Sequence, residues 1–211
     1  MADGYFISLD GIDGGGKSTQ CQLLLDWFSQ NGHPGIVCRD PGGTTLGEKV
    51  RSILLSKNTG NIDRTAEMLL YMASRAQLTT EVIQPALNAG QIVISDRYLL
   101  ANVVYQGYGG GLDVDALWKI GHIATGGLNP DLTFILDLPY DQARKRQQSE
   151  RDRMESLPAD FFSRVQEGFL HEASKQPDKI SVIPASGSIQ AIHAQIVAIV
   201  SEQFPMYPSN S

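Results

Sequence analysis

Cysteine and long hydrophobic runs are both scarce in this sequence, and each absence excludes a class of protein. The chain has two cysteines in 211 residues, Cys21 and Cys38, which excludes a scaffold held together by disulfides. Neither lies among histidines or further cysteines, so we do not expect a metal site built on them. No apolar run has membrane length and the N-terminus has no signal-peptide pattern, which favours a soluble protein of the reducing cytoplasm.

Basic residues are also few relative to acidic ones. Lysine and arginine number 17 against 23 aspartate and glutamate, for a formal net charge of −6. A binder of nucleic-acid polymers would show a basic stripe, and none is visible, so we expect neither a nucleic acid nor a membrane as partner. Local arginines must then hold any small anionic ligand. The length suits a single domain over residues 1–211, and no internal repeat or low-complexity block divides it.

Glycine, in contrast, is concentrated in one informative motif. Residues 11–19 read Gly-Ile-Asp-Gly-Gly-Gly-Lys-Ser-Thr, which fits the phosphate-loop pattern G-x-x-x-x-G-K-[ST]. In such a loop the backbone N–H groups and the lysine hold phosphates, and the serine hydroxyl reaches Mg²⁺. An ordinary glycine-rich turn is the alternative, but a strand-like run precedes this loop and a helical pattern follows it. The expected nucleotide-binding residues are Gly11, Gly14, Gly15, Gly16, Lys17, Ser18 and Thr19.

Strand-like and helix-like segments alternate along the whole chain. This alternation predicts a three-layer α/β fold, a five-stranded parallel sheet with helices on both faces. The expected strands are residues 5–10, 35–39, 92–96, 132–137 and 180–183. The expected helices are residues 17–31, 46–56, 65–88, 114–125, 140–147, 158–175 and 189–203. Ligands of such sheets bind at the carboxyl ends of the strands, so the residues that follow each strand are the candidates for function.

Two of these strand ends carry polar motifs. The second expected strand leads into Arg39-Asp40-Pro41-Gly42-Gly43-Thr44, which is equally typical of a simple turn. The third leads into Ser95-Asp96-Arg97-Tyr98. A carboxylate after a strand beside a phosphate loop typically holds Mg²⁺ or its water shell, so Asp96 joins Ser18 as an expected metal ligand.

Further motifs follow in order, and together they make the chain resemble the bacterial thymidylate kinases, nucleoside-monophosphate kinases of the phosphate-loop class. They are Tyr105-Gln106-Gly107, Asn129-Pro130-Asp131-Leu132, Asp137-Leu138-Pro139 and Asp152-Arg153-Met154-Glu155. The resemblance covers nearly the whole chain. It implies transfer of the γ-phosphate of ATP to dTMP with Mg²⁺, giving dTDP and ADP for dTTP biosynthesis, and a homodimer formed by helix packing.

Three alternatives remain open at this point. One is another nucleotide or deoxynucleoside kinase, with UMP, dUMP or a nucleoside as acceptor. Another is a phosphate-loop ATPase that works as a switch, although a switch needs no second phosphate site. A third is a non-catalytic nucleotide-binding homologue, against which the intact Lys17, Ser18, Asp96 and Arg153 argue.

The acceptor site is expected on a long helix and on the loops beside it. Tyr71 and Arg75 are four residues apart and share one helix face. Spacing alone favours a core position for Tyr71, in a stripe with Met68, Leu69 and Met72, whereas the resemblance implies that it stacks on the base. The resemblance also implies roles for the other members of the dTMP set, which is Asp13, Arg51, Tyr71, Arg75, Arg97, Asn102, Tyr105 and Gln106.

Every remaining member except Gln106, which enters only through its motif, has a chemical reason to be there. Arg51 suits bidentate binding of the acceptor phosphate, unless it is a solvated surface arginine. Arg97 is expected to face the transferring phosphoryl group, and Asp13 to orient the acceptor phosphate or a metal-bound water. Asn102 has both donor and acceptor atoms for a base edge, with Tyr105 near base and sugar.

A charged segment, residues 144–156, is the expected mobile lid. A charge run is usually a solvated helix end. Some thymidylate kinases, however, carry an arginine in the phosphate loop where this chain has Gly14, and the resemblance implies that the lid supplies the arginine instead. Arg153 of the Asp-Arg-x-Glu motif is the first choice and Arg151 the second, followed by Arg144 and Arg146. The expected catalytic residues are Lys17, Asp13, Arg97, Arg153 and Arg151.

Two positions depart from the pattern of the family. Asp40 stands where the family usually has glutamate, which puts the contact of that carboxylate in question. Ala101-Asn102 replaces a usual pair of hydroxyl residues, which affects the hydrogen bonds expected at the thymine edge. The Asp40–Pro41 peptide can be cis or trans as far as the sequence is concerned.

Overall fold

A parallel sheet forms the centre of the protein, whose computed structural model describes residues 4–146 and 152–204. Its strands are β1 (Phe6–Asp10), β2 (Gly35–Arg39), β3 (Ile92–Asp96), β4 (Leu132–Asp137) and β5 (Ile180–Pro184), in the order β2-β3-β1-β4-β5. The predicted strands are confirmed to within one residue at each end. All five residues of β1 are buried, as expected for a central strand covered on both faces.

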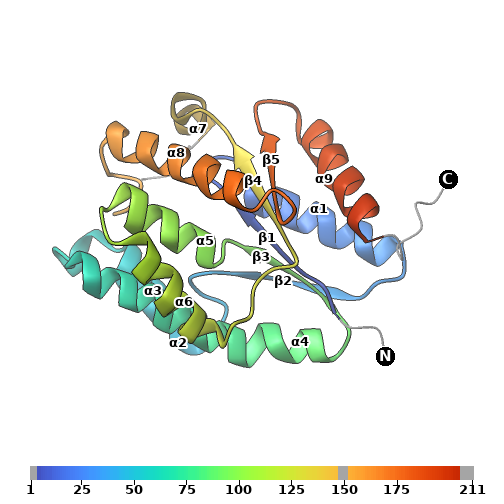
Figure 1. Cartoon of the computed structure of the whole chain (residues 1–211), viewed down its shortest axis with the longest axis horizontal. Coiled ribbons are helices and arrows are strands. Elements are labelled where there is room, and N and C mark those ends of the chain that lie inside the picture. Colours follow the sequence, from blue (N-terminus) through green and yellow to red (C-terminus); the bar gives the residue numbers. More distant parts are fainter. Residues whose placement is uncertain (1–3, 147–151, 205–211) are drawn as a thin grey trace.

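Helices cover both faces of this sheet (Figure 1). On one face lie α1 (Lys17–Gln30) and α9 (Ile189–Gln203). On the other lie α3 (Arg64–Leu78), α5 (Leu99–Asn102), α6 (Val114–Thr125) and α8 (Ala159–Lys175). The remaining helices are α2 (Thr45–Leu55), α4 (Gln84–Asn88) and α7 (Tyr140–Arg146), with a short 3₁₀ turn η1 (Lys57–Thr59). Within the described ranges, no helix has both the length and the apolar character to cross a membrane.

Local sequence explains where several helices begin. The side chains of Thr44, Asp63, Asp113 and Ser188 accept hydrogen bonds from backbone N–H groups in the first turns of α2, α3, α6 and α9. Such caps satisfy donors that have no partner within the helix. These four starts therefore follow from short-range chemistry.

The single helix predicted over residues 65–88 is interrupted. Between α3 and α4 lies a π-helical segment, η2 (Thr79–Ile83), with Pro85 in the first turn of α4. Proline has no N–H to donate to the preceding turn, so the hydrogen-bond ladder takes the wider π spacing there. A second π-helical segment, η3 (Val103–Gly109), continues α5 and lines part of a pocket described below.

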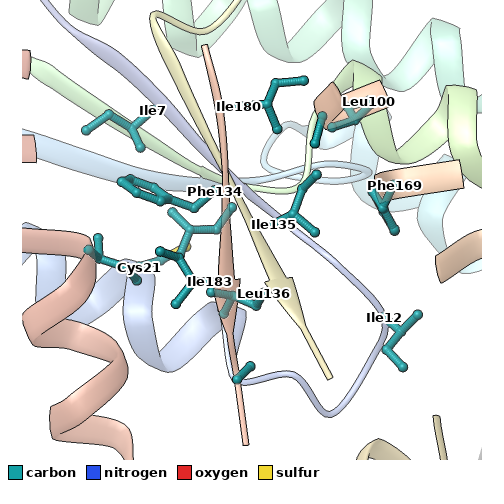
Figure 2. Close-up of a cluster of buried hydrophobic side chains, with 14 of the residues drawn as sticks. Ile7, Ile12, Cys21, Leu100, Phe134, Ile135, Leu136, Phe169, Ile180 and Ile183 are labelled. Carbon is teal, nitrogen blue, oxygen red and sulfur yellow. The ribbon is translucent and has the colours of Figure 1, made fainter. Parts of the chain in front are cut away.

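The core lies on both sides of β4 (Figure 2). Phe134 extends toward Cys21 of α1, whereas Ile135 extends to the opposite face, toward Leu100 and Phe169. This alternation follows from the two-residue period of a strand. Phe134 is fully buried and Ile135 nearly so. A sheet anchored on both faces gives the loops at its carboxyl ends a rigid base.

Candidate active site

The glycine loop between β1 and α1 has the conformation of a phosphate cradle. Gly11, Gly14 and Gly16 have φ values of +125°, +83° and +91°, a region that favours glycine. The backbone N–H of Gly15 donates to the Ile12 carbonyl at 3.3 Å and closes the turn. Helix α1 begins directly after Gly16, so its positive end faces the loop.

An open pocket lies in front of this loop. Residues of the predicted nucleotide set that line it are Gly14, Gly16, Lys17, Ser18 and Thr19, joined by Asp13, Arg51, Asp96 and Arg146. Gly11 and Gly15 are not in its lining. A Cβ at Gly11 would lie 2.6 Å from the Leu136 carbonyl oxygen, so this glycine is needed where the loop passes β4.

Gly14 explains how α7 reaches the loop. A Cβ at this position would lie 2.5 Å from the Ala143 carbonyl oxygen. Any side chain here would therefore displace α7 from the phosphate loop. With glycine, α7 approaches closely and its last residue, Arg146, lines the phosphate pocket. Arg146 Nη1 donates to the Ala185 carbonyl at 3.0 Å, which fixes one end of the guanidinium.

Asp13 connects two cations at the mouth of the loop. Arg97 Nη2 donates to Asp13 Oδ1 at 2.8 Å, and Lys17 Nζ lies 3.7 Å from the same oxygen. Burial raises the pKa of Asp13, but the charges of Arg97 and Lys17 outweigh it and bring this pKa below its ordinary value. Asp13 is therefore an ionised acceptor. Lys17 also donates to the Ile12 carbonyl at 2.9 Å, which folds its side chain against the loop.

The backbone of Arg97 is strained. Its φ of +70° is the only positive value for a non-glycine among the described residues. Such a conformation costs on the order of 1–3 kcal/mol and persists where neighbours enforce it. Here the Arg97 N–H donates to the Leu9 carbonyl at 2.9 Å and the Ser95 hydroxyl donates to the Arg97 carbonyl at 2.6 Å. The two bonds hold the strand end so that the guanidinium meets Asp13.

Two oxygen-bearing side chains of a kind suited to a divalent cation lie beside the loop. Ser18 Oγ donates to Asp96 Oδ2 at 2.5 Å, so the two residues predicted to share a metal lie side by side. Mg²⁺ is usually held by one or two carboxylates together with phosphate oxygens and waters. No group of three or more His, Cys, Asp or Glu within the described chain could hold a metal. The hydroxyl and carboxylate pair thus fits a nucleotide-bound Mg²⁺ rather than an all-protein cage.

A second pocket adjoins the first, between α3, η3 and the loop after β2. All of the predicted acceptor residues line it, namely Asp13, Arg51, Tyr71, Arg75, Arg97, Asn102, Tyr105 and Gln106. The lining that was not predicted consists of Asp40, Pro41, Leu55, Ala101, Asp152 and Met154. Asp13 and Arg51 also line the phosphate pocket, so they stand where the two pockets meet.

Arg75 is the buried centre of this second pocket. It is 1% exposed; Nε donates to Asp40 Oδ2 at 2.5 Å and Nη1 to Asn102 Oδ1 at 3.0 Å. The carboxylate of Asp40, whose contact the sequence left in question, thus has an arginine partner. The Asp40–Pro41 peptide is cis. Arg51 Nη1 donates to the Pro41 carbonyl at 2.9 Å, so it is not a freely solvated arginine.

Two tyrosines complete the walls. Tyr71 is half-buried and lines the pocket, so the core interpretation drawn from its spacing is wrong; Leu69 of the same stripe is 51% exposed. Met68 and Met72 do belong to the core. Tyr105 lies under the Arg97 guanidinium, 5.0 Å from its ring centroid, and its hydroxyl accepts from Arg97 Nη2 at 3.3 Å. Burial raises the pKa of Tyr105, so its phenol stays protonated.

Arg153 is the predicted residue that the structure does not bring to the phosphate loop. Its guanidinium pairs with Glu67 of α3, and its Nε donates to the Leu54 carbonyl at 2.7 Å. Its backbone N–H donates to the Leu55 carbonyl at 3.1 Å, which docks this end of the predicted lid on α2. Arg151 lies outside the described residues. Among the described arginines of the charged segment, Arg146 lines the phosphate pocket.

Sequence reasoning missed Glu67 altogether. It is 9% exposed and lies one helical turn before Tyr71 on α3. The four-residue spacing was the available signal, because it places Glu67 on the face of the helix that carries Tyr71 and Arg75.

Comparison with known proteins gives a consistent result. Residues 9–196 match the family model described as thymidylate kinase. A thymidylate kinase of Kosmotoga olearia is 44% identical over 194 residues, which cover 91% of this chain and 93% of the relative. One of Rhodopirellula baltica is 43% identical over 196 residues, 93% of this chain and 80% of the relative. The crystal structure of a thymidylate kinase from Ehrlichia chaffeensis superimposes with a TM-score of 0.78 at 30% identity and covers 94% of this chain and 99% of that one.

Proposed function

Since the chain belongs to the thymidylate kinase family, it is a nucleoside-monophosphate kinase for dTMP, and we propose how its two pockets divide the work. The phosphate loop takes ATP and the pocket around Arg75 takes dTMP. One observation carries this assignment: the pockets meet at Asp13 and Arg51, which line both of them. A donor and an acceptor phosphate can therefore approach each other at a point bordered by cations. An ATPase switch would not need the second pocket.

Phosphoryl transfer mainly requires positioning and neutralisation of charge. Bound with ATP, Mg²⁺ would be held by Ser18 and Asp96 and would neutralise the phosphate oxygens. Lys17 would exchange its contact with the Ile12 carbonyl for the phosphates. Arg97, oriented by Asp13, would face the transferring group. A general base is not required, because the acceptor oxygen of dTMP is already ionised.

The acceptor roles follow from the lining of the second pocket. Tyr71 offers a ring face for the pyrimidine and Arg51 a guanidinium for the acceptor phosphate. Arg75 and Asn102 offer polar atoms to the base edge, and Tyr105 packs below Arg97 toward the sugar. We propose a single kinase domain in which residues 144–156 act as the lid. Arg146 is the first candidate for the lid cation at the γ-phosphate, ahead of Arg153.

A homodimer is part of the proposal. Helices α2, α3 and α6 pack side by side (Figure 1). They expose Leu46, Ile53, Leu69 and Ile123, the last 80% exposed. A second copy packed on these helices would cover these apolar side chains. Light scattering on Leu69→Glu against the unaltered chain tests it, because a dimer at this face would become a monomer. A cytoplasmic location stays a prediction from the sequence.

The activity is tested by coupled measurement of ADP release with dTMP, dUMP, UMP and dCMP as acceptors. We expect turnover with dTMP that exceeds the rate without acceptor and that needs Mg²⁺. Turnover with dTMP no faster than without an acceptor refutes the proposal. Equal turnover with UMP replaces it by a broader pyrimidine-nucleotide kinase.

A further inference from the structure

We propose that Glu67 is a positioning residue that sets the orientation of the side-chain amides of Gln106 and Asn102 in the acceptor pocket. It does so with one carboxylate oxygen while the other holds Arg153 of the predicted lid. This inference rests on the proposed function, since it takes dTMP as the occupant of the pocket.

A continuous row of hydrogen bonds links Glu67 to Arg75. Gln106 Nε2 donates to Glu67 Oε1 at 2.9 Å. Asn102 Nδ2 donates to Gln106 Oε1 at 2.7 Å. Arg75 Nη1 then donates to Asn102 Oδ1 at 3.0 Å. Glu67 is 9% exposed, and Asn102 and Gln106 are 2% and 3% exposed, so water cannot readily replace these partners.

The two ends of the row give it one direction. An ionised carboxylate can only accept hydrogen bonds and a guanidinium can only donate them. If the Gln106 amide turned over, its oxygen would face the Glu67 carboxylate and its NH₂ would face the NH₂ of Asn102. Each buried group left unpaired in this way costs about 1–3 kcal/mol. The charges of Glu67 and Arg75 therefore determine the orientation of the two amides between them.

The direction of the row matters for choosing the base. With its oxygen turned to Arg75, Asn102 holds that guanidinium from one side while Asp40 holds it from the other. Arg75 presents only donors to the pocket in either case, and its two fixed partners keep these donors in one place. A thymine carbonyl accepts hydrogen bonds at the position where cytosine carries a donating amino group. A fixed row thus favours dTMP over dCMP, whereas a row that can reverse discriminates less.

The second carboxylate oxygen of Glu67 connects the base-binding side of the pocket to the charged segment. Arg153 Nη2 bonds to Glu67 Oε2, and Arg153 is held in place by the carbonyl of Leu54 and by the backbone bond to Leu55. One carboxylate therefore serves two partners from distant parts of the chain. Removing the charge of Glu67 should weaken the hydrogen bonds to both Gln106 and Arg153.

The test is Glu67→Gln, which keeps the shape of the side chain but offers either an oxygen or an NH₂. We expect the KM for dTMP to rise about tenfold and the dTMP-to-dCMP ratio of kcat/KM to fall about tenfold, the difference between a charged and a neutral hydrogen bond. The KM for ATP should stay within twofold. Glu81→Gln is the matched control, because Glu81 is an exposed residue of η2 bonded to Gln77. All its constants should stay within twofold.

A double-mutant cycle separates positioning from general destabilisation. Gln106→Leu cuts the row but leaves the Glu67–Arg153 pair, and it should lower the same ratio. If Glu67 acts through Gln106, the double variant should lose no more than the worse single variant. Fully additive losses, or a KM for dTMP of Glu67→Gln within twofold of the unaltered enzyme, overturn the inference.

Two further controls keep the result decisive. Thermal unfolding and ATP affinity show whether each variant folds; if Glu67→Gln does not fold, an unchanged ratio in Gln106→Leu alone overturns the row. Measurements on the unaltered enzyme distinguish a failure of the proposed function from a failure of the role proposed for Glu67. No dTMP turnover there refutes the proposed function, whereas normal turnover together with an unaffected Glu67→Gln refutes only this inference.

Discussion

Replacing Arg75 by methionine should be among the most destabilising single changes in the acceptor pocket. Methionine fills a similar volume without charge. The side chains of Arg75 and Asp40 are 2% and 0% exposed and 2.5 Å apart, so Arg75→Met leaves a carboxylate buried without its cation. Removing one partner of such a pair costs about 3–5 kcal/mol of unfolding free energy. The variant should also lose most of its dTMP affinity, while ATP affinity changes little.

The pH dependence of the variant gives a second readout. Without Arg75, burial raises the pKa of Asp40 further above its unfolded value, and the folded state then binds a proton that the unfolded chain releases. The stability of the variant should therefore fall as pH rises above about 4, so that the loss relative to the unaltered protein is larger at pH 8 than at pH 5. Adding Asp40→Asn should recover part of the lost stability at pH 8.

Urea unfolding followed by circular dichroism at both pH values measures these quantities, and calorimetric titration measures the affinities. A loss below about 1 kcal/mol at pH 8 would show that the pair contributes little. Failure of Asp40→Asn to recover stability would show that the cost has another origin, such as the contacts of Arg75 with Asn102 and with the Tyr98 ring.

Three further predictions concern single residues. Arg146→Ala should lower kcat about a hundredfold with dTMP affinity unchanged, by analogy with other cationic fingers, whereas Arg153→Ala should act mainly on the KM for dTMP; steady-state kinetics with the reverse pattern would restore Arg153 as the catalytic arginine. Tyr71→Ala should weaken dTMP binding about tenfold without affecting ATP, through loss of a stacking face, and unchanged dTMP affinity in calorimetry would contradict a contact with the base. Burial raises the pKa of Asp10 from 3.8 to about 7, so the folded state loses on the order of 4 kcal/mol from this group as pH rises from 4 to 8. Asp10→Asn should remove that loss, and equal pH dependence of urea unfolding in variant and parent would refute the assignment.

Local patterns were enough to predict most of the fold. The strands, the phosphate loop and the capped starts of helices are each specified by residues within a few positions of one another. The break in the helix over residues 65–88 was missed although Pro85, inside that range, is a sequence signal for one; the structure shows the π-helical segment before it. Cys21 and Cys38 are both buried free thiols.

Residues that are distant in the sequence but adjacent in the fold could be predicted only where a motif contained them. Asp13 and Arg97 belong to such motifs, and they do line the acceptor pocket. Glu67 belongs to no motif. Its spacing from Tyr71 placed it on the same helix face, but its partner Arg153 lies 86 positions away in the sequence. No periodicity or spacing rule connects two side chains at that separation.

The phosphate loop shows most clearly which features depend on local sequence and which depend on tertiary packing. By itself the sequence predicted a phosphate loop over residues 11–19 with glycine, not arginine, at position 14, because glycine conformation and backbone N–H geometry are local properties. Only the tertiary structure shows the consequence of glycine at position 14. The Ala143 carbonyl oxygen of α7 lies 2.5 Å from where a Cβ of residue 14 would be, and Arg146 of the same helix lines the phosphate pocket. Which arginine arrives depends on how helices pack across the sheet, and that packing balances contacts from the whole chain rather than from any one segment.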